Sequence, residues 1–219
     1  MRALVTGGTG RVGSAIAARL RQERWSVKAA GRADGDVSEV EEARSLVARA
    51  VEELGGLDLL VNAAGEGFAP VPVEDMTEAH WDAAFGATAK GSFFVTQAAA
   101  PHLRKSRGCV VMIEDVAAYQ PWRSFAAHCA AKAAQAMLTR VLARALAPEV
   151  RVCGVAPGSV AVEEGQEERR AAETLLGRIG SPEDVAAAVV YLAGADFVTG
   201  VSLVVDGGRL LQSVPPRPP

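Results

Sequence analysis

The sequence of 219 residues lacks the features of a membrane-spanning, exported or nucleic-acid-binding protein. No apolar run approaches the roughly 20 residues that a membrane span needs. The first residues contain neither the basic nor the apolar region of a signal peptide. The net charge of −3 gives no electrostatic reason to expect an anionic membrane or a nucleic acid as partner. These absences predict a cytoplasmic protein that acts on small molecules.

Cysteine is also scarce. Cys109, Cys129 and Cys153 are odd in number, and their spacing matches neither a metal-ligand motif nor a redox motif. Two of them fall in predicted buried strands, where a thiol behaves as a small apolar side chain. We therefore expect free thiols in a reducing compartment and no metal site.

What the sequence does contain is a regular alternation of apolar strands with amphipathic helices. The hydrophobic share of 49% and the charged share of 22% are typical of a globular domain. Strands are predicted at 2–6, 25–31, 57–62, 109–113, 150–155 and 201–205, and helices at 14–23, 38–54, 77–105, 124–147 and 182–193. Such alternation predicts the α/β class, as a doubly wound parallel sheet covered by helices on both faces.

The domain organisation is expected to be simple. Residues 1–212 are predicted to form one Rossmann-type domain, and residues 213–219 a proline-rich tail. The span between Gly31 and Leu57 has room for a single helix, where a complete first half needs a helix, a strand and a second helix. We therefore expect a shortened first half and a sheet of about six strands.

The clearest motif lies at the first junction between a strand and a helix. The strand over residues 2–6 leads into four glycines between Gly7 and Gly13, and a helical stretch follows. Glycine allows positive φ and close approach of the backbone, and the N-terminus of a helix attracts anions. This order predicts a turn that holds the pyrophosphate of a dinucleotide.

Further motifs occur in a fixed order along the chain. They are Thr6-Gly7-Gly8-Thr9-Gly10-Arg11-Val12-Gly13, Val61-Asn62-Ala63-Ala64-Gly65, Pro157-Gly158 and Asp206-Gly207-Gly208. Together they resemble the short-chain dehydrogenase/reductase family over nearly the whole chain. Arg11, where most members carry glycine, and the stretch 146–152 resemble its pteridine-reductase and dihydrofolate-reductase-like branch. The resemblance implies a Rossmann sheet, a nicotinamide dinucleotide and usually a homotetramer.

The resemblance also implies a set of cofactor-binding residues. These are Gly7, Gly10, Arg11, Val12, Gly13, Arg32, Asp36, Val37, Asn62, Ala63, Ala64, Gly65, Thr88, Lys132, Pro157 and Gly158. Within this set the glycine turn would hold the pyrophosphate, Asp36 the adenine and Lys132 the ribose of the nicotinamide. Arg11 either reaches the pyrophosphate or a substrate oxygen, or lies on the surface.

The residues after the second strand bear on the choice of cofactor. NAD-preferring folds carry an acidic side chain there, which bonds the ribose hydroxyls and repels a 2′-phosphate. This chain has Gly31-Arg32 instead, and a guanidinium matches a phosphate in charge and geometry. The pattern favours NADP(H) over NAD(H). The alternative is a solvated Arg32, with Asp34 or Asp36 bonding the ribose.

Three residues align with the catalytic positions of the family, in which a tyrosine donates the proton and a lysine follows four residues later. Lys132 matches the lysine, and His128 stands at the tyrosine position. Asp115, thirteen residues before His128, matches the residue that orients the substrate. Thr88 replaces the family's helix-borne asparagine. Either His128 donates the proton, or Asp115 does so while His128 has a structural role.

The resulting hypothesis is an NADPH-dependent oxidoreductase that acts on a pterin-like or carbonyl substrate, as a homotetramer or homodimer. Because two of four family positions are altered, two alternatives stay open. One is a catalytically degenerate NADP(H)-binding protein that serves as a sensor or partner subunit. The other is non-redox chemistry on the same fold.

Overall fold

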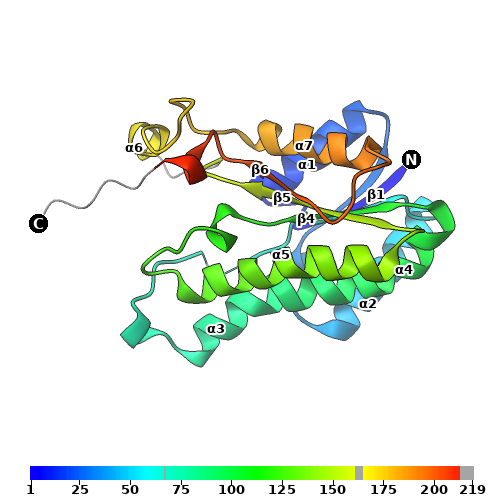
Figure 1. Cartoon of the computed structure of the whole chain (residues 1–219). Coiled ribbons are helices and arrows are strands. Elements are labelled where there is room, and N and C mark those ends of the chain that lie inside the picture. The colour runs from blue at the N-terminus through cyan, green and yellow to red at the C-terminus, as the bar shows by residue number, and fades with distance from the viewer. Residues whose placement is uncertain (67, 161–164, 213–219) are drawn as a thin grey trace, which may run out of the picture.

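We analysed a computed structural model of the chain, which describes residues 1–66, 68–160 and 165–212. Six strands in this part of the chain form one sheet, in which every neighbouring pair is parallel. The strands are β1 (Arg2–Thr6), β2 (Ser26–Ala30), β3 (Leu59–Asn62), β4 (Cys109–Ile113), β5 (Arg151–Pro157) and β6 (Ser202–Val205). Their order is β2-β1-β3-β4-β5-β6 (Figure 1).

Helices cover both faces of the sheet (Figure 1). On one face lie α1 (Arg11–Gln22) and α7 (Pro182–Gly194), and on the other α2 (Val40–Leu54), α4 (Ser92–Ser106) and α5 (Ala126–Leu146). The short helices α3 (Glu78–Phe85) and α6 (Glu167–Ala171) lie near the carboxyl ends of the strands. Because α1 and α2 follow β1 and β2 on opposite faces, the chain changes direction at β1, which is the switch point of the sheet.

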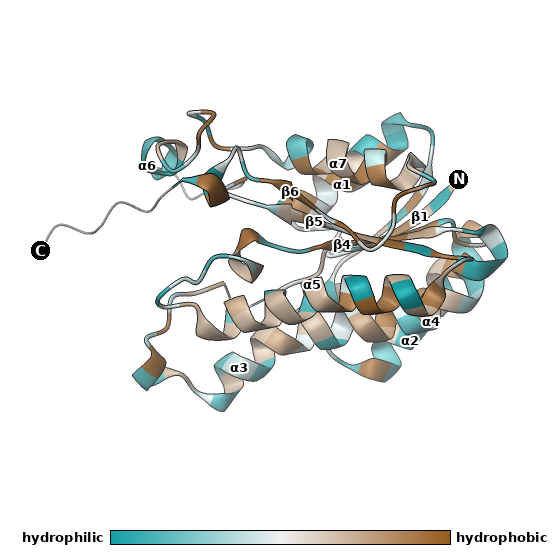
Figure 2. Ribbon diagram, viewed as in Figure 1, coloured by the Kyte–Doolittle hydropathy of each residue, from teal (hydrophilic) through white to brown (hydrophobic). Residues whose placement is uncertain are grey.

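The core consists of two apolar layers separated by the sheet. Leu4, Leu60 and Met112 face α2 and α4, while Val5, Val61 and Val111 face α1 and α7. The period-2 alternation of side chains along each strand produces this division. In Figure 2 apolar colouring follows the central strands, whereas polar colouring gathers on the outward turns of the helices. Both faces of the sheet are therefore buried, which explains the almost uninterrupted apolar strands in the sequence.

Helix ends follow from local sequence signals. Ser181 caps α7, with its side chain accepting from the Asp184 N–H, and Pro182 occupies the first helical position. Gly55 ends α2 with a φ of 71°, a left-handed conformation that glycine adopts without strain. These signals explain why the sequence located both helices to within two residues.

The prediction of a six-stranded parallel sheet with a shortened first half is confirmed. Between Gly31 and Ser38 the chain forms a 3₁₀ turn over Arg32–Asp34 in place of a strand. Strand β2 is therefore an edge of the sheet. Its Lys28 ammonium lies 3.0 Å from Glu53 and 3.6 Å from Asp34, and a charged edge resists pairing with other chains.

The single helix predicted over residues 77–105 is wrong in one respect. The structure has α3, then a π-helical turn over Gly86–Gly91, and then α4. A Cβ on Gly91 would lie 2.9 Å from the Val37 carbonyl oxygen. The turn thus packs against the segment that follows β2, and apolar periodicity alone did not reveal the extra residue of the turn.

Two expectations concern the remaining parts of the chain. No helix among the described residues is both long enough and apolar enough to cross a membrane. Residues 213–219, the predicted proline-rich tail, lie outside the described residues.

Candidate active site

The glycine turn between β1 and α1 is closely packed. Gly7 has a φ of 64°, and a Cβ there would lie 2.5 Å from the Ala63 carbonyl oxygen. A Cβ on Gly13 would collide with the Gly7 carbonyl oxygen. Glycine is therefore required at both positions. The N-terminus of α1 follows Gly10, which has no side chain to cap it, and the first turn of α1 contains no acidic residue. Its backbone N–H groups are thus suited to an anion.

A cavity of about 370 Å³ lies beside this turn, at the carboxyl ends of β1, β2 and β3. Eight of the predicted cofactor residues line it: Gly7, Gly10, Arg32, Asp36, Val37, Ala63, Ala64 and Gly65. The cavity thus lies at the switch point of the sheet, where open α/β folds bind their ligands. The glycine turn, the uncapped start of α1 and the position of the cavity are the features by which open α/β folds hold a dinucleotide.

Asp36 and Arg32 form the far wall of the cavity. Asp36 accepts hydrogen bonds from the Ser38 hydroxyl at 2.7 Å and the Ser38 N–H at 2.9 Å. These bonds hold the pKa of the Asp36 carboxyl below its ordinary value. The side chain of Arg32 is 62% exposed and donates to Glu66 at 2.5 Å. Glu66 is a cavity residue that sequence reasoning missed, and it holds Arg32 at the rim of the cavity.

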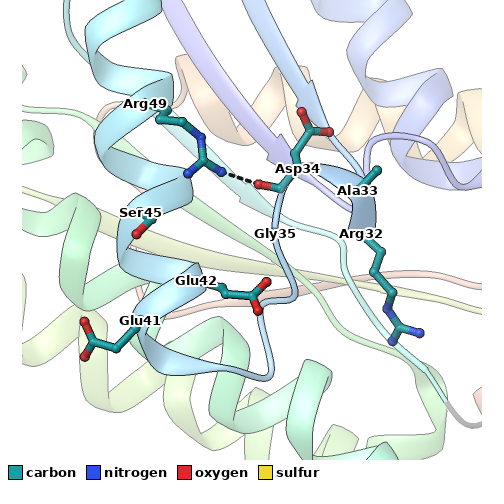
Figure 3. A pocket seen from close by; sticks show the side chains of 8 residues that line it. All are labelled: Arg32, Ala33, Asp34, Gly35, Glu41, Glu42, Ser45 and Arg49. Atoms are coloured by element: carbon teal, nitrogen blue, oxygen red, sulfur yellow. Dashed lines mark hydrogen bonds between the residues drawn. The ribbon is translucent and has the colours of Figure 1, made fainter.

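A second hollow of about 360 Å³ lies on the other side of the Arg32–Asp34 turn. Figure 3 shows Arg49 reaching from α2 to the Asp34 carbonyl oxygen, with Arg32 on the opposite side of Gly35. The turn therefore separates two hollows, and Arg32 borders both. Arg49 stabilises the turn that takes the place of a third strand in the first half of the sheet.

The other predicted cofactor residues lie outside the wall of this cavity. Asn62 is buried and donates to the Thr96 hydroxyl at 3.0 Å and to the Met112 sulfur at 3.3 Å. Thr88 is buried in the π-helical turn. The remaining members lie at the start of α1, in the second turn of α5, and at or just after the end of β5; they are Arg11, Val12, Gly13, Lys132, Pro157 and Gly158.

Asp115 and His128 lie together beyond the end of β4. The Asp115 Oδ1 atom accepts from the Ala117 N–H at 2.8 Å, while its Oδ2 atom lies 3.5 Å from His128 Nε2. His128 is in the first turn of α5 and is 8% exposed. Its buried Nε2 atom has no hydrogen-bond partner among the described residues. One carboxylate oxygen thus caps the backbone and the other faces the imidazole.

Lys132 lies one turn further along α5. Its ammonium donates to the Ile113 carbonyl oxygen at 2.8 Å and to Gln135 Oε1 at 3.1 Å. Burial lowers the pKa of Lys132, and the negative charges of Asp115 and Glu114 act against that lowering. The ammonium is therefore fixed between the end of β4 and the interior of α5.

Glu114 is buried on the other side of the same strand end. Its carboxylate accepts from the hydroxyls of Thr139 at 2.6 Å, Ser202 at 3.0 Å and Tyr119 at 3.1 Å. Burial and the neighbouring Glu114 raise the pKa of the Tyr119 phenol. The three hydroxyls satisfy Glu114, which ties β4 to α5 and β6 beneath the candidate site.

Three aromatic rings surround His128, and the sequence pattern did not reveal them. Phe68 lies edge-on to the imidazole at 5.0 Å, Trp122 is nearly parallel to it at 6.1 Å, and Phe125 lies at 6.5 Å. The Arg209 guanidinium lies over Trp122, 5.1 Å from the ring centroid. Because the rings come from two loops that are distant in sequence from Arg209, only the fold brings this apolar wall together.

The doubly wound parallel sheet, with a glycine turn and a cavity at its switch point, defines the class of dinucleotide-binding α/β proteins. The family model described as Enoyl-(Acyl carrier protein) reductase matches residues 10–209. The chain is 37% identical to the predicted ketoacyl reductase 2 of the granaticin polyketide synthase of Streptomyces violaceoruber, covering 95% of this chain and 96% of that protein. It is 32% identical to human dehydrogenase/reductase SDR family member 4, covering 94% and 86%.

A solved structure gives the same picture. The ligand-free aldohexose dehydrogenase of Thermoplasma acidophilum superposes with a TM-score of 0.92 at 26% identity, covering 100% of this chain and 96% of that one. The chain belongs to the short-chain dehydrogenase/reductase family, a family of oxidoreductases.

Proposed function

We propose that the protein is an NADPH-dependent reductase that acts on a pterin-like or carbonyl substrate. The observation that carries this proposal is the adjacency of Asp115, His128 and Lys132 at the end of β4, on the same edge of the sheet as the cavity at the carboxyl ends of β1, β2 and β3. A bound NADPH supplies a hydride to the substrate. The protein then has to bind the cofactor, orient the substrate and deliver a proton.

Cofactor binding is assigned to the switch-point residues. The N–H groups of the turn from Gly7 to Gly13 would hold the pyrophosphate, and Asp36 and Val37 would hold the adenine. Arg32 would leave Glu66 for a 2′-phosphate, because a dianionic phosphate attracts a guanidinium more strongly than a single carboxylate does. The third N–H of the Lys132 ammonium would bond the nicotinamide ribose.

Proton delivery is assigned to the pair formed by Asp115 and His128. The two groups lie 3.5 Å apart, a distance that a small side-chain movement closes to a hydrogen bond. The Asp115 Oδ1 atom is held by a backbone N–H, so the carboxylate stays oriented with Oδ2 toward His128. A proton passes from this pair to the substrate oxygen or ring nitrogen as the hydride arrives.

The aromatic wall supports a flat substrate. Phe68, Trp122 and Phe125 enclose one side of His128 and present ring faces and edges rather than charged groups. Aromatic pairs favour stacked or edge-to-face arrangements. Pterins and aromatic carbonyl compounds match this surface better than a sugar does. Purified protein should therefore oxidise NADPH in the presence of at least one member of a panel of pterins, quinones and aryl ketones, and not with aldohexoses.

Arg32 provides the test of cofactor choice. The wild type should bind NADPH at least about tenfold more tightly than NADH, a difference of about 1.4 kcal/mol. Arg32→Ala should remove most of that difference, because the guanidinium that pairs with the 2′-phosphate is gone, and should leave NADH affinity nearly unchanged. Fluorescence titration of both cofactors measures this. Equal affinities in the wild type would refute the assignment.

Assembly into a homodimer or homotetramer is also proposed. Met137 and Val141, which are 54% and 51% exposed, form with Ala133 a stripe at i, i+4 and i+8 along α5. Small and apolar side chains on a long helix suit packing against a second copy about a two-fold axis. Met137→Arg should lower the mass measured by light scattering, whereas Val73→Arg, at an exposed residue outside the stripe, should not. A wild-type monomer at micromolar concentration would contradict this proposal.

A further inference from the structure

Gln135 is a fully buried polar side chain in contact with Lys132. It lies on α5, three residues after Lys132, and faces the start of α4. Its Oε1 atom accepts from the Lys132 ammonium at 3.1 Å, and its Nε2 atom donates to the Ser92 hydroxyl at 2.8 Å and to the Thr88 carbonyl oxygen at 3.4 Å. The amide thus joins the ammonium to the π-helical turn.

These partners fix the orientation of the amide. Lys132 has only donors, so the oxygen of the amide must face it. The Thr88 carbonyl has only an acceptor, so the amide nitrogen must face the turn. The Ser92 hydroxyl can serve as the acceptor for the second N–H. A buried amide with all of its groups satisfied has one orientation, which it imposes on the ammonium.

Each N–H group of the Lys132 ammonium can likewise be assigned an acceptor or a direction. An ammonium has three N–H groups. One is used by the Ile113 carbonyl oxygen and one by Gln135 Oε1. Because these two acceptors fix both the position and the rotation of the ammonium, the third N–H points in a single direction.

We propose that Gln135 is a positioning residue. It holds the Lys132 ammonium in the orientation that the cofactor ribose requires, and it prevents proton transfer from the ammonium toward the π-helical turn. This inference rests on the proposed function. A carboxamide neither gains nor loses a proton near neutral pH, so it can orient an ammonium without relaying protons. The link from Lys132 to the Thr88 carbonyl therefore holds the ammonium in place but conducts no proton.

The consequence concerns the source of the proton in the reduction. In that step the nicotinamide C–H bond would break and the cofactor would be oxidised, while a C–H bond forms at the substrate carbon and its C=O or C=N double bond becomes single. The substrate oxygen or nitrogen would take a proton from an enzyme group, which is left deprotonated. Because Gln135 passes no proton to Lys132, the proton comes from the Asp115–His128 pair, and water on the substrate side restores it. Among the described residues, Asp115 and Glu114 act on the charge of Lys132, and His128 lies against Asp115.

The first test measures the position of the ammonium without relying on turnover. Gln135→Met removes the acceptor and keeps the length of the side chain, so Lys132 should become at least about tenfold more reactive toward an amine-acylating reagent, as followed by mass spectrometry. Gln97→Met, at an exposed glutamine on α4, should leave that reactivity unchanged. Unchanged Lys132 labelling in folded Gln135→Met protein would overturn the positioning role, whether or not the protein is a reductase.

The second test distinguishes the positioning of Lys132 from the block on proton transfer through Gln135. Affinity for NADPH should fall at least tenfold in Gln135→Met and stay within about threefold of the wild type in Gln135→Glu. In the latter one carboxyl oxygen still accepts from Lys132, and the other, when protonated, still donates to the Thr88 carbonyl oxygen. Gln135→Glu also introduces a group that can carry a proton, so the pH dependence of kcat should change while the KM for NADPH does not. If the pH dependence of kcat in Gln135→Glu matches that of the wild type, the proposal that Gln135 blocks proton transfer is wrong. If the wild type binds NADPH but oxidises none with the panel, it is the proposed reductase function that fails.

Discussion

Asp115→Asn is expected to lower kcat by at least about a hundredfold, the scale at which a positioned proton donor contributes. The substitution keeps the Oδ1 acceptor for the Ala117 N–H, so the turn after β4 should stay folded. It removes the group that faces His128 Nε2 and that can hold a proton. NADPH affinity should be unchanged, because no cofactor contact is assigned to Asp115 and the Lys132 ammonium keeps its bonds to the Ile113 carbonyl oxygen and to Gln135.

The matched control is Asp75→Asn, at an exposed aspartate outside the site, which should leave kcat unaltered. His128→Tyr then identifies the donor. If Asp115 supplies the proton, His128→Tyr should change rates less than about tenfold, or 1.4 kcal/mol. If His128 supplies it, the phenol beside Lys132 should raise the rate with a carbonyl substrate further. Unchanged activity in Asp115→Asn, His128→Ala and Lys132→Ala would move the chemistry to another site.

The second large effect is expected from Gly13→Ala. The added Cβ would collide with the Gly7 carbonyl oxygen and lie 2.8 Å from the Gly7 carbonyl carbon. Since both are backbone atoms of the turn, relief requires the turn itself to move and the cradle to open. We expect NADPH affinity to fall at least about a hundredfold, or about 2.7 kcal/mol.

Calorimetric titration of the folded Gly13→Ala protein measures this effect. Gly194→Ala is the matched control, because a Cβ at Gly194 meets nothing within 4 Å and its φ is not positive. That variant should bind NADPH like the wild type. Wild-type affinity in Gly13→Ala would show that the glycine turn does not hold the pyrophosphate.

Much of the fold could be predicted from short-range patterns. Strands such as Cys109–Ile113 are apolar on both faces, and helix ends such as those of α2 and α7 carry glycine, serine and proline signals. The missing strand was predictable because the length between Gly31 and Leu57 limits what can form there. The π-helical turn was not, because its extra residue leaves little trace in apolar periodicity.

The candidate site likewise contains some residues that could be predicted from the sequence and others that could not. Residues of contiguous motifs, such as the glycine turn, or at fixed helical spacing, such as His128 and Lys132, could be predicted. Glu66 could not be, since its partner Arg32 is 34 residues away in sequence, and neither could the bond from Gln135 to Ser92, which is 43 residues away. Phe68 and Trp122 meet His128 only because the loops after β3 and β4 converge at the same edge of the sheet. Long-range side-chain partners of this kind leave no periodic signal.

The most direct test of the central claim follows the hydride itself. NADPH carrying deuterium at the transferable position is incubated with the wild-type protein and the pterins and aryl ketones of the panel, whose reduction places the deuterium on carbon, where it does not exchange with water. Products are examined by mass spectrometry. The account predicts one deuterium in the reduced product, in step with cofactor oxidation, and formation of that product at least about a hundredfold more slowly with Asp115→Asn. Tight NADPH binding with no deuterium in any panel product would contradict it and identify the chain as a cofactor-binding protein without reductase activity.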